Sequence, residues 1–231
     1  GTTTIVNRAT KSLLNVVTRV PVTTGTTLRR LLQVHAVRHV QRELGHYFNN
    51  NLVLFLSGMR NYEIAVALSD YTKNLSFADP VFQAGSPLLL TSLTQLELYA
   101  KGNEYVAGIK PWRMLEKSFS GLKNMRVARA VRNAHVVVGS FDEIKAVGSP
   151  ANLDGKTLIT AAVDDEQLAF YKKCKVNLVI DVSPKLFEHV VGIDALEAMI
   201  LAKLGRPAEE IADEDFAEII AELGLEPRLL H

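Results

Sequence analysis

The feature that most constrains the fold of this chain is an unbroken apolar run, Leu52–Leu56. It ends at Ser57 and Gly58, and an apolar run without polar alternation is typical of a strand buried on both faces of a parallel sheet. Residues 61–71 follow with apolar side chains at helical spacing, and Leu75–Ala78 is a second short apolar segment. Strand, helix and strand in this order form a βαβ unit, whose crossover is right-handed by default.

The same alternation continues along the rest of the chain. It predicts further strands at His135–Val138, Thr157–Ala161 and Asn177–Asp181. It predicts helices at Thr27–Gly45, Leu88–Ala100 and Asp165–Lys173, and two closing amphipathic helices around 196–204 and 213–223, the second capped by Asp213. We therefore expect an α/β fold with a doubly wound, mostly parallel, Rossmann-like sheet.

The first 49 residues follow a different pattern. Short strands are expected at Thr2–Val6 and Val20–Gly25, with a short helix at Lys11–Val17 between them. We interpret residues 1–49 as a partial N-terminal region of the substrate-binding type, and residues 50–231 as the Rossmann-like domain with C-terminal helices. Because 49 residues are few for a complete substrate domain, the chain is interpreted as a fragment or as a protein that lacks that part.

Composition narrows the classes of partner. The formal net charge is only +1, which gives no field for nucleic acid or an anionic membrane, and no apolar run is long enough to span a bilayer. The single cysteine, Cys174, excludes an internal disulfide and a multi-cysteine metal site, so we expect a cytoplasmic protein. The expected partner is a small-molecule ligand, and a homo-oligomer is left open.

Ligands of doubly wound sheets bind beyond the carboxyl ends of the strands. There the loop Ser57–Asn61 leads into a helix N-terminus that favours phosphate. Asp79 lies 21 residues after Gly58, where a dinucleotide fold holds a ribose hydroxyl. The full glycine fingerprint is absent, so an ordinary strand-to-helix turn with Asp79 as a turn acid is the alternative. The predicted cofactor-binding residues are Ser57, Gly58, Arg60, Asn61, Asp79, Gly139 and Ser140.

Three other residues carry chemistry in principle. His35 and His39 are spaced as metal ligands on one helix face, but we expect packing histidines and no metal site. Cys174 lies among lysines that would lower the pKa of its thiol, but a lone thiol at a helix end is usually inert.

A family resemblance is carried by motifs that occur in order along the chain. They are Thr18–Gly25, Ser57–Tyr62, Ala78–Pro87, Ala134–Phe141, Leu153–Thr157, Ala195–Ile200 and Gly205–Pro207. In this order they resemble the quinate/shikimate 5-dehydrogenase-like family. The resemblance implies a Rossmann-type domain that binds NAD or NADP, beside a substrate domain. The sequence departs from the family because the segment Asn15–Pro21 is not followed by the lysine expected of an authentic shikimate dehydrogenase.

Two main functions remain open from the sequence. One is an NAD(P)-dependent oxidoreductase, a relative of quinate/shikimate dehydrogenases, in which Lys145 is the weak catalytic candidate near the nicotinamide loops. The other is a non-catalytic, nucleotide-binding Rossmann module that acts as a sensor or docks a partner. A third hypothesis is that the protein has the same fold but binds another small ligand, such as an adenylate or a sugar phosphate.

Overall fold

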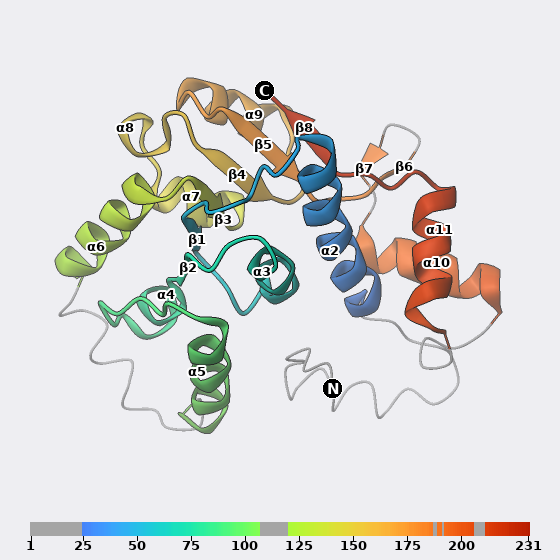
Figure 1. Ribbon diagram of the computed structural model, residues 1–231, viewed down its shortest axis with the longest axis horizontal. Coiled ribbons are helices and arrows are strands. Elements are labelled where there is room, and N and C mark those ends of the chain that lie inside the picture. The colour runs from blue at the N-terminus through green and yellow to red at the C-terminus, as the bar shows by residue number, and fades with distance from the viewer. Residues whose placement is uncertain (1–24, 107–119, 187–188, 191, 206–210) are drawn as a thin grey trace.

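The computed structural model describes residues 25–106, 120–186, 189–190, 192–205 and 211–231. The strands and helix predicted before residue 25 lie outside these residues. Within them the chain forms a mixed α/β fold around a six-stranded sheet with the order β2-β1-β3-β4-β5-β8 (Figure 1). The first five strands in this order are parallel to one another, and β8 is antiparallel to β5.

The five strands predicted after residue 50 are all present, each within one residue of its expected bounds at either end. The strands of the sheet are β1 Val53–Phe55, β2 Leu75–Phe77, β3 Val136–Val138, β4 Thr157–Thr160, β5 Leu178–Asp181 and β8 Arg228–Leu230. Strand β8 was not predicted. The expected α/β fold with a mostly parallel sheet is confirmed.

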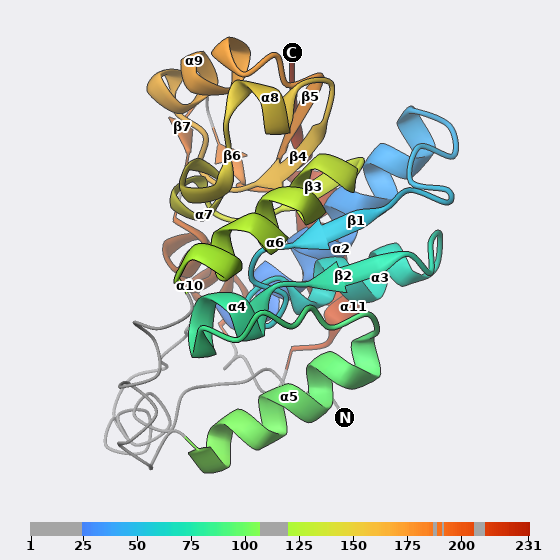
Figure 2. The same cartoon turned by 90° about the vertical axis from the view of Figure 1, so that its left-hand side faces the viewer.

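The helices cover both faces of the sheet. Their bounds are α2 Thr26–Glu43, α3 Tyr62–Ser69, α4 Asp79–Ala84, α5 Leu93–Val106, α6 Ser120–Asn133, α7 Phe141–Val147, α8 Pro150–Leu153, α9 Asp165–Lys173, α10 Ile193–Leu204 and α11 Asp213–Glu222. On one face Val53 and Phe55 pack against α2, α3 and α5. On the other face Leu54 and Leu56 pack against α4, α6, α7, α8 and α9. Figure 2 shows α6 lying along the sheet and α5 beyond the edge strand β2.

Helix α2, which precedes the domain boundary predicted near residue 50, contacts two apolar clusters. One end of α2 packs on the sheet through Ala36, Val37 and Val40. Its other end, through Leu28 and Leu32, forms a second apolar cluster with α10 and α11. Among the described residues, α2 therefore packs on the sheet at one end and on the two closing helices at the other.

Several elements differ from the sequence prediction. Helix α5 begins at Leu93 rather than Leu88, because Leu90 pairs with Phe77 as a short extended bridge beside β2. Helices α4, α6, α7 and α8 were not predicted. The last helix begins at Asp213 itself, with Ala212 as its N-cap. A small hairpin, β6 Lys185–Leu186 with β7 His189–Val190, was also not predicted.

Candidate functional site

The candidate site lies where the strand order reverses, between β1 and β3. The connections from these two strands run in opposite directions, and ligands of such sheets usually bind beyond the carboxyl ends of the strands at this point. We call this position, between the turns that follow β1 and β3, the crevice. The loops Ser57–Asn61 and Gly139–Ser140 both lie there. Arg60 Nη1 and Glu143 Oε1 meet across the crevice at 4.0 Å, with Arg60 largely exposed and Glu143 mostly buried. The structure therefore brings the two predicted loops together.

Asp79 does come close to Gly58, but the two bind each other. The Asp79 side chain is fully buried. Its Oδ2 accepts the Gly58 N–H at 2.8 Å and its Oδ1 accepts the Met59 N–H at 2.9 Å. These N–H groups are the ones expected to bind a cofactor phosphate, and this carboxylate is the one expected to bind its ribose. The N–H groups and the carboxylate therefore bind each other. This is the geometry of the alternative interpretation, an ordinary turn in which Asp79 is a turn acid.

Gly58 is required by packing. A Cβ atom at this position would meet the Phe77 ring closer than van der Waals contact allows and would lie 3.0 Å from Asp79 Oδ2. The glycine thus lets the turn approach β2, and a nearby cofactor is not needed to explain it.

A second buried acid closes the turn after β4 in the same way. Asp181, the last residue of β5, is fully buried. Its carboxylate accepts the N–H groups of Ala162 and Val163, each at 3.0 Å, and that of Ser183 at 2.9 Å, and it pairs with Arg228 of β8. Sequence analysis missed this role. The sequence signal that could have revealed it is an acidic residue, Asp181, at the end of the apolar strand β5. The neighbouring strand β4 ends in the turn that this acid closes.

The loop after β3 is closed by a third acid. Glu143 Oε2 accepts the Ser140 N–H at 2.8 Å, and the Ser140 hydroxyl accepts the Glu143 N–H at 3.4 Å, which is a capping box at the start of α7. The Gly139 N–H donates to Ile159 O at 3.1 Å. Of the groups around this loop, Glu143 Oε1 is the one that faces Arg60 and the crevice.

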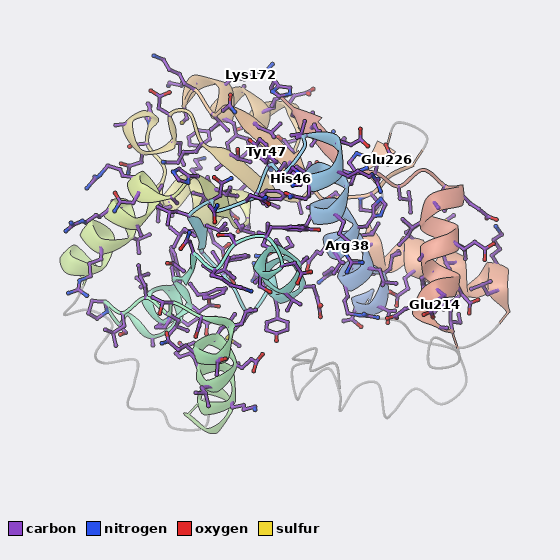
Figure 3. All side chains as sticks on the ribbon, in the orientation of Figure 1. Arg38, His46, Tyr47, Lys172, Glu214 and Glu226 are labelled. Atoms are coloured by element: carbon purple, nitrogen blue, oxygen red, sulfur yellow. The ribbon has the colours of Figure 1, made fainter. Side chains whose placement is uncertain are left out.

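The remaining candidates lie away from the crevice chemistry. Lys145 is exposed on α7, with Nζ 5.4 Å from the centroid of the Phe141 ring. Cys174 is buried, and burial raises the pKa of its thiol more than the charge of Lys173 lowers it, while Lys172 lies at the outer surface of α9 (Figure 3). Both observations favour the inert interpretation of the thiol.

The two histidines of α2 pack beside each other. The rings of His35 and His39 are 6.0 Å apart, and His39 Nδ1 lies 3.9 Å from Glu226 Oε1, at the side of α2 (Figure 3). Across the described part of the chain, no three histidine, cysteine or acidic side chains gather closely enough to hold a metal ion. In the same residues no helix is long and apolar enough to cross a membrane.

The crevice combines two acids with one exposed cation. Burial raises the pKa of Asp79, the N–H groups of Met59 and Gly58 lower it, and the nearby charge of Glu143 raises it again. The net shift of this pKa is upward, so desolvation outweighs the hydrogen bonds to backbone N–H groups. Because Asp79 already accepts the Gly58 and Met59 N–H groups, the exposed positive group of the β1–α3 turn is the guanidinium of Arg60.

The raised pKa of Asp79 predicts how stability depends on pH. Because the folded protein binds this proton more tightly than the unfolded chain, the contribution of Asp79 is present below its unfolded pKa of about 3.9 and is lost as pH rises through its folded pKa. In Asp79→Asn this contribution is absent. The free energy of unfolding of the wild-type protein, measured relative to Asp79→Asn by urea denaturation, should therefore fall as pH rises above about 4. Parallel pH profiles for the two proteins would contradict the shift.

Comparison with known proteins gives one match. Residues 27–231 match a family described as a domain of unknown function, DUF8754. No curated protein and no solved structure matches the chain with significance.

Proposed function

Because the chain belongs to the DUF8754 family, a domain of unknown function, we propose its role from the geometry of the crevice: a non-catalytic, nucleotide-binding module with a Rossmann-like fold. Such a module acts as a nucleotide sensor or docks a partner protein. The observation that carries the proposal is the Arg60–Glu143 pair, which spans the point of strand reversal while the neighbouring turns are closed by buried acids. The strand order supports a nucleotide as the ligand, because doubly wound sheets with this order bind nucleotides at that point.

The closed turns argue against a dinucleotide dehydrogenase. A pyrophosphate on the β1–α3 turn would have to displace Asp79 from the Gly58 and Met59 N–H groups. Each such hydrogen bond to a charged group is worth about 1.5–3 kcal/mol, and the displaced carboxylate would stay buried beside the pyrophosphate. Hydride transfer also needs a group that moves a proton, and Lys145 lies against Phe141 on the surface of α7. It carries no part of the proposed function.

A mononucleotide fits the remaining groups better. The exposed guanidinium of Arg60 suits a phosphate, which it can bind through two parallel hydrogen bonds. Glu143 Oε1 can accept a hydrogen bond from a ribose hydroxyl, because the other oxygen of this carboxylate already accepts the Ser140 N–H. Arg60 and Glu143 would then exchange their weak mutual contact for contacts with the ligand. Ser57 and Asn61, on the β1 side of the crevice, would line it.

Calorimetric titration with AMP, ATP, FMN, NAD and NADP tests the proposal. We expect a mononucleotide to bind, and Arg60→Ala to weaken that binding roughly tenfold or more, the loss of one charged hydrogen-bonding partner. Arg42→Ala is a matched control, because Arg42 is also exposed and weakly paired, with Glu43 at 3.6 Å, but lies on α2. It should leave the affinity unchanged.

Two outcomes would reject the proposal. One is that none of the five nucleotides binds the wild-type protein. The other is steady reduction of NAD or NADP with quinate or shikimate, which would restore the dehydrogenase assignment.

A further inference from the structure

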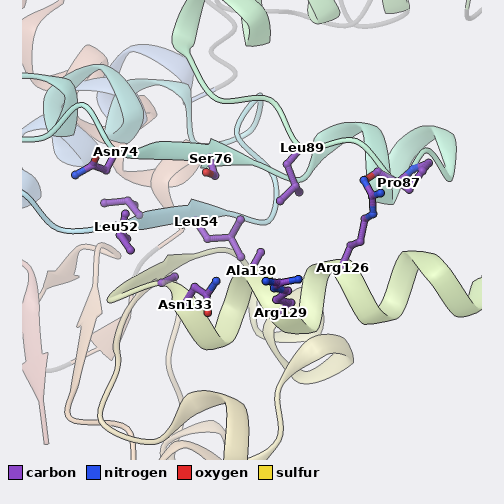
Figure 4. Close-up of a pocket in the computed structure, with 12 residues that line it drawn as sticks. Leu52, Leu54, Asn74, Ser76, Pro87, Leu89, Arg126, Arg129, Ala130 and Asn133 are labelled. Atoms are coloured by element: carbon purple, nitrogen blue, oxygen red, sulfur yellow. The ribbon is translucent and has the colours of Figure 1, made fainter.

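A second site is formed at the opposite end of the strands. A groove of about 530 Å³ runs between α6 and the edge strand β2 (Figure 4). Leu52 and Asn74, which precede β1 and β2, line it, so it opens toward the amino ends of these strands rather than toward the crevice. The volume lies within the range of about 300–1,000 Å³ that is common for small-molecule sites.

The groove exists because the edge strand presents a small polar side chain to this face. Leu75 and Phe77 of β2 point to the opposite face and are buried there, so the alternation of a strand directs Ser76 toward α6. Ser76 is too small to fill the space between β2 and α6. The apolar part of the lining is given by Leu54, Leu89 and Ala130.

Two arginines of α6 make the groove positive. Arg126 and Arg129 are three residues apart, so they lie on the same side of the helix, and both line the groove (Figure 4). Arg126 Nη1 donates to Pro87 O at 3.1 Å, which ties α6 to the other wall. Neither arginine takes part in an ion pair with another described residue. Two guanidinium groups beside an apolar lining form a complementary surface for an anion with an apolar body.

We propose that this groove binds a small organic anion that carries a carboxylate or phosphate on a compact apolar body. The acidic group lies on Arg129, with Arg126 beside it. The apolar body lies against Leu54 and Ala130. Ser76 supplies a hydroxyl that orients the ligand, and Asn133 supplies a side-chain amide. This site is independent of the nucleotide proposed for the crevice, because the two share no residue.

The test is an NMR titration of the ¹⁵N-labelled protein with phenyl phosphate and with benzoate. Benzyl alcohol is the neutral analogue, and inorganic phosphate is the anion without an apolar body. We expect both aromatic anions to shift the amide signals of Leu54, Ser76 and Ala130. We expect benzyl alcohol and inorganic phosphate to bind at least tenfold more weakly, because the first lacks the negative charge and the second lacks the apolar body. The better of the two anions identifies the acidic group.

Variants on α6 decide whether the groove or a general basic surface binds the anion. Arg129→Gln should weaken binding roughly tenfold, through loss of a charge-assisted hydrogen bond. Arg132→Gln is the matched control, because Arg132 is an exposed arginine one turn farther along α6 and does not line the groove. Ala130→Phe should block binding by filling the groove while leaving its charge unchanged.

Equal effects of Arg129→Gln and Arg132→Gln, or no signal shifts with either aromatic anion, would overturn the proposal. Arg60→Ala should not alter binding of these anions. That variant separates failure of this site from failure of the nucleotide site in the crevice.

Discussion

Replacement of Asp181 by alanine should destabilise the protein by about 3–5 kcal/mol, the range for breaking a buried charged pair. The carboxylate is fully buried and accepts three backbone N–H groups in addition to its pairing with Arg228. Alanine would remove the side-chain acceptor of the Val163 and Ser183 N–H groups and the charge that pairs with the mostly buried guanidinium, whose remaining acceptor is Val163 O. It would also remove the side-chain contact at one end of the β5–β8 ladder, where Arg228 is the residue paired with Asp181. Urea denaturation monitored by circular dichroism measures the loss.

The cause of that loss is tested by a double-mutant cycle with Arg228→Met. If the buried pair dominates, the double variant should be more stable than the sum of the single effects predicts, by about 0.5–3 kcal/mol. Asp194→Ala is the control for an exposed acid, since Asp194 pairs with Arg29 at 3.3 Å while both side chains are well exposed. It should cost no more than about 1 kcal/mol. If Asp181→Ala and Asp194→Ala lowered the free energy of unfolding by similar amounts, burial of the Asp181 pair would not contribute to stability.

The sheet was predictable because a strand buried on both faces must be apolar throughout. Leu52–Leu56 shows this directly, with alternate side chains packed into the cores on the two faces. Strand β8 was not predictable in the same way. Its three residues are only partly buried, and it is assigned to the sheet by pairing with β5, far away in the sequence. Helix α6 was missed because Gly121, in its first turn, made its start look like part of an irregular stretch, although the helix itself is amphipathic.

The candidate site was predictable in place but not in function. Sequence spacing correctly brought Asp79 to Gly58, because the end of one parallel strand lies beside the turn that follows its neighbour. Spacing does not reveal whether the carboxylate points outward to a ribose or inward to the turn. The direction of the carboxylate depends on how closely the turn approaches β2, and Gly58 allows a close approach to Phe77. Asp181 repeats the arrangement with no glycine, so it gave no fingerprint to recognise.

The largest effect is expected from Phe55→Asp, which should abolish the folded state. Phe55 is fully buried and stacks on Phe77 with the ring centroids 5.0 Å apart. Loss of such a ring alone costs about 3–5 kcal/mol, and an unpaired carboxylate at the same place adds several more. This sum is comparable with the whole stability of a typical domain, about 5–15 kcal/mol.

Circular dichroism and a thermal melt give the readout, with Leu98→Asp as the control for the added charge. Leu98 is 63% exposed on α5, so a carboxylate there stays in water and should change the stability by no more than about 0.5 kcal/mol. Phe55→Leu should fold but melt earlier, because it keeps an apolar side chain and loses only the stacking with Phe77 and part of the buried volume. A melt of Phe55→Asp that coincides with that of the wild-type protein would mean that β1 does not lie at the centre of the sheet.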